Sequence, residues 1–195
     1  MERDAVATRA AVTEGGSDTK GRIIDAAEEV VLRDGVARLT LDAAAAEAGL
    51  SKGGVLYHFP TRNALVAGMV DRIIAEFDED IERQREGEGP GSFTRAYIRS
   101  TMAPAVARPD RQDRLGAALI AAAAAEPELL VPLQRAADRW QRRIAHDGLD
   151  PTVATLLRLA CDGLWLCDLF GLAPPSTRLR SALGLELERL ASEPT

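Results

Sequence analysis

The stretch that decides the fold of this 195-residue chain is GLSKGGVLYHFPTRNAL, residues 49–65. It places two adjacent glycines, Gly53 and Gly54, after a serine suited to cap a helix and before an apolar run. Glycine costs roughly 1 kcal/mol relative to alanine in a helix interior. Two glycines in the first turn of a short helix therefore indicate that another molecule comes very close to that backbone.

The residues on either side predict a helix-turn-helix. A helix starting near Thr19 has one apolar face and ends at Asp34-Gly35. Thr40 is expected to cap a short second helix that Gly49 ends, and Ser51 a short third helix that ends near Phe59. A helix followed by two short helices around a tight turn is the arrangement of DNA-binding helix-turn-helix units.

The charge distribution in this region favours a polyanionic partner. Although the formal net charge is −6, the window from Ala48 to Val70 contains no Asp or Glu and includes Lys52, His58 and Arg62. Local charge counts more than the total when one face meets a polyanion. Thr40 and Ser51 also stand at predicted helix N-termini, where unpaired amides and the helix dipole favour a phosphate.

The rest of the chain is also predicted to be helical. A long helix runs from Pro60-Thr61 to about residue 85 and ends in EGEGPG, and further helices are expected over 92–107, 110–126, 127–146, 150–170 and 175–191. No alternating strand pattern is present in the sequence. We therefore expect an all-α fold: a disordered arm over 1–17, a three-helix helix-turn-helix unit over 18–66 and a larger helical body over 67–195.

The segment LTLDAAAAEAGLSKGGVLYHFPTRNALVAGMV, residues 39–70, resembles the DNA-binding region of TetR-type (TetR/AcrR) transcriptional regulators. The shared pattern is a threonine-led second helix, a sequence of the form AGxSKGxxYxxF and a capped fourth helix, and the resemblance covers about residues 19–70. One departure is that Leu56 stands at the usual tyrosine position and is followed by Tyr57-His58. Either Tyr57 or His58 is therefore the candidate for reading a base.

The resemblance implies a role for each matching residue. Four side chains would hold DNA phosphates: Thr40, His58, Thr61 and Arg62. Ser51 would add a helix N-terminus, and four residues would face the floor of the major groove: Lys52, Gly53, Gly54 and Tyr57. The apolar core of this unit is expected to comprise Ile23, Val30, Leu41, Ala45, Leu50, Val55, Leu56 and Phe59.

The larger body is expected to bind a small-molecule effector. Candidate ligand-binding residues are Met102, Trp140, Asp162 and Trp165. A core position for the two tryptophans, and capping or pairing with an arginine for Asp162 and Asp168, are the competing interpretations.

Assembly is predicted from residues 150–170, a segment opened by Asp150-Pro151 and apolar nearly all round. Such a helix needs cover on every side, and the helix over 175–191 carries its own apolar stripe. The two helices are therefore expected to form a homodimer interface about a two-fold axis. The thiols Cys161 and Cys167 are expected to be buried and structural.

Together these features predict a transcriptional regulator that binds double-stranded operator DNA, a repressor released from a palindromic site by a small molecule. The alternative is a helical adaptor that binds a protein partner instead of DNA.

The sequence shows no nucleophile motif, metal-ligand spacing or phosphate-binding loop, so we expect no catalytic residue, metal or cofactor. It also shows no signal peptide or membrane span, so we expect a cytoplasmic protein.

Overall fold

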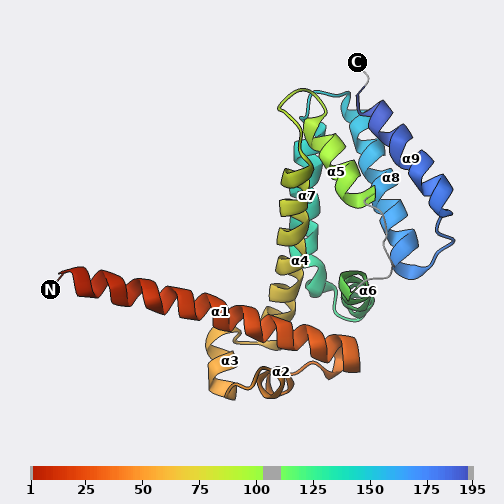
Figure 1. Ribbon diagram of the computed structural model, residues 1–195. Helices are drawn as coiled ribbons and strands as arrows, with labels where there is room; N and C mark the ends of the chain where they lie inside the picture. The colour runs from red at the N-terminus through yellow and green to blue at the C-terminus, as the bar shows by residue number, and fades with distance from the viewer. Residues whose placement is uncertain (1, 103–110, 193–195) are drawn as a thin grey trace. The chain divides into compact units, whose positions relative to one another are not determined.

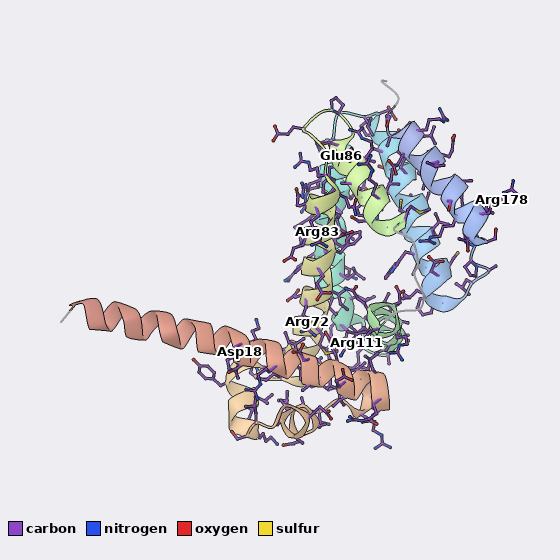
Figure 2. The ribbon with its side chains drawn as sticks, viewed as in Figure 1. Asp18, Arg72, Arg83, Glu86, Arg111 and Arg178 are labelled. Carbon is purple, nitrogen blue, oxygen red and sulfur yellow. The ribbon has the colours of Figure 1, made fainter. Side chains whose placement is uncertain are left out.

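The structure, a computed structural model, describes residues 2–102 and 111–192, with side-chain detail from Asp18 onward (Figure 2). All regular structure in these ranges is helical (Figure 1). The elements are α1 (Glu2–Asp34), η1 (Val36–Arg38), α2 (Leu41–Ala48), α3 (Lys52–His58), α4 (Arg62–Gln84), α5 (Ser92–Met102), α6 (Arg111–Ala123), η2 (Pro127–Leu130), α7 (Val131–Ala145), α8 (Pro151–Phe170) and α9 (Thr177–Leu190). The predicted all-α class is confirmed.

One boundary differs from the sequence prediction. Helix α1 begins at Glu2 and includes the residues that we expected to form a disordered arm. Alanine, the strongest helix former, recurs through that stretch and favours the continuation. The expected extension of the fifth helix over 103–107, and residue 110, lie outside the described residues.

The chain divides into two compact units. The first contains residues up to Val70 together with Ala118–Leu129, and the second contains Asp71–Ala117 and the residues from Leu130 onward. Helices α4 and α6 each begin in one unit and end in the other.

In the first unit, α1 packs on α2, and α2 packs on α3. Its core is built from fully buried apolar side chains on four helices: Ile23, Val30, Ala45, Val55, Phe59, Leu65 and Met69. Leu56, which we placed in this core, is instead 40% exposed. A seven-residue helix has one face to bury, and Val55 and Phe59, four residues apart, occupy it.

A glycine on α4 allows the end of α3 to pack closely. A Cβ added at Gly68 would lie 2.7 Å from Cε1 of Phe59, and the methyl of Ile24 is close behind it. Phe59 is the C-cap of α3 and is buried. Gly68 therefore leaves the space into which this ring fits.

The second unit is organised around α5, eleven residues of which eight are buried. Figure 1 shows α5 among α7, α8 and α9, and it contacts all three. Three rings from α4, α5 and α7 meet edge to face: Phe77 lies 5.4 Å from Tyr97 and 5.2 Å from Trp140, measured between ring centroids. Tyr97 and Trp140 of this aromatic cluster are buried in the core of the second unit.

The N-terminus of α5 is capped by a residue that lies far away in the sequence. The carboxylate of Asp147 accepts hydrogen bonds from the amides of Phe93 (3.3 Å) and Thr94 (2.7 Å) and from the hydroxyl of Thr94 (2.9 Å). The carbonyl of Asp147 accepts from the amide of Gly91 at 2.6 Å. Gly91 has a φ of +75°, and a Cβ there would lie 2.5 Å from the carbonyl oxygen of Ala191. Glycine is therefore required at this turn.

The two thiols differ in exposure. Cys161 is buried, as predicted, whereas Cys167 is half-buried. Cys167 lies 600° around α8 from Cys161, so the two side chains point to different sides of the helix. Burial raises the pKa of the Cys161 thiol to about 12.

We expect Asp147→Ala to lower the free energy of unfolding by about 1–3 kcal/mol, because it leaves two buried amides and a hydroxyl without their acceptor. Chemical denaturation measures this value. The matched control is Asp138→Ala, on the exposed face of α7, which should change stability by less than about 0.5 kcal/mol. Equal stabilities for the two variants would contradict the role of Asp147.

We expect the Cys161 thiol to resist labelling until the protein unfolds. With a pKa of about 12, roughly one thiol in ten thousand is ionised at pH 8, and only the thiolate reacts. A Cys167→Ser variant, which leaves Cys161 as its only thiol, allows the rate to be measured with and without denaturant. Rapid labelling of this variant in its native state would show that Cys161 is accessible.

Candidate nucleic-acid interface

Three hydroxyl residues cap the helices of the first unit, as the sequence predicts for Thr40 and Ser51. Oγ1 of Thr40 accepts from the amide of Ala43 at 3.0 Å, and Oγ of Ser51 accepts from the amide of Gly54 at 3.1 Å. Oγ1 of Thr61 accepts from the amide of Ala64 at 3.0 Å. Each hydroxyl accepts one bond in its cap, so its own proton stays available to an acceptor such as a phosphate oxygen.

The glycines of α3 are not required by the packing of the protein. A Cβ added at Gly53 would have as its nearest neighbour Oγ of Ser51 at 4.0 Å, and one at Gly54 would lie 3.5 Å from the same atom. Both glycines have helical backbone conformation. Alanine would therefore fit at both positions and favour the helix, so the contacts within the described residues do not explain the choice of glycine.

The end of α3 presents an exposed aromatic side chain. Tyr57 is 85% exposed, while His58 is half-buried and meets the Tyr57 ring edge to face at 5.0 Å. Burying so much of a tyrosine on a partner is favourable, and its hydroxyl can donate or accept a hydrogen bond. Of the two candidates for base reading, Tyr57 is the more accessible.

Lys52 and Arg62, the two basic residues on either side of the exposed end of α3, each have a carboxylate partner. Nζ of Lys52 lies 2.8 Å from Oδ2 of Asp42 on α2. The guanidinium of Arg62 donates to both carboxylate oxygens of Glu126, at 2.8 and 3.1 Å. Asp42 and Glu126 both lie outside residues 48–70, so the absence of Asp and Glu from that window does not reveal either partner. The spacing of Asp42 on the neighbouring helix offers a weak signal for the first pair, but nothing in the sequence indicates the second, which joins residues 64 positions apart.

Two of the four candidate effector residues lie around the aromatic cluster. Trp140 is buried, and its indole Nε1 donates to Oδ1 of Asp78 at 2.6 Å. Asp162 accepts from the hydroxyl of Tyr97 at 2.7 Å and from Arg158 at 2.5 Å. Burial, with Asp162 as a second cause, raises the pKa of the Tyr97 hydroxyl well above its usual value. The core interpretation of Trp140 and the arginine pairing of Asp162 are confirmed.

The other two candidates, Met102 and Trp165, make no ring contact or hydrogen bond with this cluster among those found in the described residues. Met102 lies against Gly184 of α9, and Trp165 is half-buried on α8. Asp168, on the same helix, pairs with Arg180. A shallow depression on α4 is lined by Asp78, Glu79, Glu82 and Arg83, the last of which is labelled in Figure 2, and none of these is a predicted effector residue.

Within residues 2–102 and 111–192, no three His, Cys, Asp or Glu side chains gather as metal ligands would. In the same ranges, no helix combines the length and hydropathy that crossing a bilayer requires.

Models of two protein families match the chain, and together they cover most of it. Residues 23–69 match the family of bacterial regulatory proteins named for tetR. Residues 91–192 match a family of C-terminal domains described as tetracyclin repressor-like. The first match contains α2, α3 and the caps described above.

Curated relatives match over part of their length. The HTH-type transcriptional regulator TtgR of Pseudomonas putida is 35% identical over 75 residues, which cover 38% of this chain and 35% of that protein. SrpR of Pseudomonas putida, also an HTH-type transcriptional regulator, is 36% identical over 75 residues, with 36% of this chain and 35% of that protein covered. The chain thus spans about a third of the length of these curated relatives.

Solved structures match over nearly the whole chain. A putative TetR-family regulator from Rhodococcus sp. has a TM-score of 0.69 at 21% identity, covering 90% of this chain and 100% of its own. A TetR-family member from Streptomyces coelicolor A3 has a TM-score of 0.67 at 26% identity, covering 88% and 97%. The multidrug binding protein EbrR, solved with ethidium, has a TM-score of 0.67 at 25% identity, covering 88% and 98%. With its helix-turn-helix and its helical body both matched, the chain belongs to the TetR family of transcriptional regulators.

Proposed function

We propose that this regulator represses transcription by binding a palindromic operator in double-stranded DNA and that a small molecule releases it. In this proposal residues 18–66 bind DNA, and residues 67–195 hold the effector and the dimer interface. The observation that carries the proposal is the surface of α3, where two glycines without an internal packing reason stand beside an exposed tyrosine. A duplex pressed against the first turn of α3 supplies the missing reason.

The proposed contacts divide into two kinds. The caps Thr40, Ser51 and Thr61, with His58, bind phosphates and fix the register on the duplex. Lys52, Gly53, Gly54 and Tyr57 face the major groove and read the sequence. Arg62, the ninth predicted residue of this interface, already uses its guanidinium for bonds within the protein.

A second copy of the chain is the proposed cover for α8. From Val153 to Phe170, every residue that α8 exposes is apolar: Val153, Leu156, Leu159, Ala160, Gly163, Leu166 and Phe170. Leu156 is 61% exposed, and α9 likewise exposes Leu179 and Leu185. An apolar strip of this length marks an interaction site, and a two-fold axis covers it with the same strip from the partner.

The dimer also suits a palindromic operator. Two identical reader helices related by a two-fold axis bind two half-sites on one face of the duplex, about 34–36 Å apart or a little more. Symmetry in the protein is thereby matched by symmetry in the DNA.

The proposed effector is a small apolar or amphipathic molecule. EbrR, a multidrug binding protein by its description, has been solved with ethidium and with malachite green, and it is 24–25% identical to this chain. Small-molecule sites combine apolar and aromatic side chains with a few polar groups, and the candidate residues of this chain are Met102, Trp140, Asp162 and Trp165. We assign the protein no catalytic role, because neither its family nor its candidate site indicates one.

We expect Gly53→Ala to weaken specific DNA binding at least about tenfold while keeping or raising stability, because a methyl group fits the free helix but occupies the space of the duplex. Tyr57→Ala should weaken specific binding by about 1–3 kcal/mol. A duplex selected from a random library by the wild-type protein provides the probe, and Glu128→Gln, an exposed change in η2, is the control. Full affinity in both variants would place the reading face elsewhere, and the adaptor alternative predicts that no duplex is selected.

We expect Leu156→Asp to dissociate the dimer, because it places two charges at a desolvated apolar contact. The sequence alone suggests Leu164 and Leu183 for such a change, but both are half-buried, so Leu156 tests the surface with less risk to the fold. Sedimentation velocity measures the mass, and Leu56→Asp, an exposed leucine of α3, serves as the control. A wild-type monomer that binds a single half-site tightly would contradict the assembly.

A further inference from the structure

The guanidinium of Arg62 is bound on three sides within the first unit. Its Nε donates to the carbonyl of Leu39 at 3.1 Å, and its Nη2 donates to the carbonyl of Val36 at 3.0 Å. Its Nη1 donates to Glu126 and to the side chain of Asn63. The planar guanidinium of Arg62 thus donates to two backbone carbonyls and one carboxylate at the same time. Lysine, with a single ammonium group, cannot reproduce this geometry.

The two carbonyls belong to the turn that leads into α2. Val36 and Leu39 are the buried residues of this turn, and Thr40, the N-cap of α2, follows directly. Arg62 therefore fixes the backbone immediately before Thr40. The position of the Thr40 hydroxyl and of the first amides of α2 depends on that turn.

Glu126 reaches Arg62 from a distant part of the sequence. It lies between α6 and η2, in the segment Ala118–Leu129 that belongs to the first unit although the neighbouring residues on both sides belong to the second. The side chains of Arg62 and Glu126 are 26% and 36% exposed. Water screens this two-oxygen contact less than it screens a surface pair.

We propose that Arg62 and Glu126 are positioning residues for operator binding, which act by holding Thr40 in place for a DNA phosphate. This inference rests on the proposed function. Arg62 makes no phosphate contact of its own in this arrangement, because each of its three guanidinium nitrogens already donates within the first unit. Glu126 strengthens DNA binding although it is negatively charged, which is the opposite of its simple electrostatic effect.

A purely electrostatic effect of Glu126 and a positioning role for it predict opposite changes in DNA affinity when its carboxylate is removed. Glu126→Gln should weaken operator binding about tenfold, because the loss of a charged hydrogen-bond partner loosens Arg62. Simple electrostatics predicts tighter binding when a negative charge is removed near a polyanion. Glu128→Gln, two residues away and exposed in η2, makes the same charge change without touching Arg62, and it should leave affinity unchanged or slightly raised.

Arg62→Lys separates positioning from direct phosphate binding. Lysine keeps the charge that a phosphate contact needs, so direct contact predicts nearly wild-type affinity. Positioning predicts a loss similar to that of Glu126→Gln, since lysine cannot bind both carbonyls and the carboxylate together. The two changes combined should be no worse than the stronger one alone, because both break the same link.

The route through Thr40 is tested by a double-mutant cycle. Thr40→Asn keeps an acceptor that caps α2 but removes the hydroxyl donor. If Glu126 acts through Thr40, Glu126→Gln costs about tenfold in the wild-type background and less than about twofold in the Thr40→Asn background. Thermal unfolding of each variant sets a temperature at which all are folded, so that a general loss of structure does not enter the comparison.

The outcomes separate this inference from the proposed function. A wild-type protein that selects no duplex overturns both. A wild-type protein that binds its duplex, with Glu126→Gln equal to it or tighter, overturns only the positioning role, and so does additivity with Thr40→Asn. Specific weakening by Glu126→Gln and Arg62→Lys, unchanged binding by Glu128→Gln and a loss of the effect with Thr40→Asn support it.

Discussion

The constraint on which the proposed interface depends is the length of α3. Isolated helices shorter than about 12–15 residues are marginal in water, and α3 has seven residues, two of them glycines. The rest of the unit must therefore hold it. The Ser51 hydroxyl fixes its first turn, Val55 anchors its middle, and the Phe59 ring enters the space left by Gly68. The side of α3 that faces solvent makes no packing contact that the fold needs. Glycines and an exposed tyrosine are therefore tolerated there.

The two basic residues next to this surface are held with very different strength. Lys52 and Asp42 form an exposed pair, with the lysine side chain 57% exposed, and such pairs contribute about 0–1 kcal/mol. Lys52 can therefore exchange its carboxylate for a phosphate or a base at little cost. Arg62 would have to give up two backbone carbonyls as well as Glu126. The sequence shows two cations near one predicted helix, whereas the structure separates an exchangeable contact from a fixed one.

Local features of the fold were predictable because their causes are local. Thr40, Ser51 and Asp150 cap helices where the sequence places them, and Gly49 ends α2 in the left-handed conformation that glycine favours. The apolar periodicities gave the order of the helices for the same reason. Leu56, Cys167 and Glu126 were not predictable in this way. Whether Leu56 or Cys167 is covered depends on which face a neighbouring helix takes, and the bond between Arg62 and Glu126 joins residues whose proximity is created only by the tertiary structure.

Helix α8 shows how one segment can serve two requirements at once. Its inner face is fixed by polar contacts as well as by packing, since Asp162 accepts from Tyr97 and Arg158 and Asp168 pairs with Arg180. Of these contacts, the bond from Tyr97 joins α8 to α5, and losing it would cost the half-buried Asp162 carboxylate a partner, so this bond favours one register of α8 against α5. Its outer face carries only apolar side chains from Val153 to Phe170, and apolar surfaces specify register poorly by themselves. The polar contacts inside therefore favour one rotation of α8, and that rotation decides which apolar residues the helix exposes.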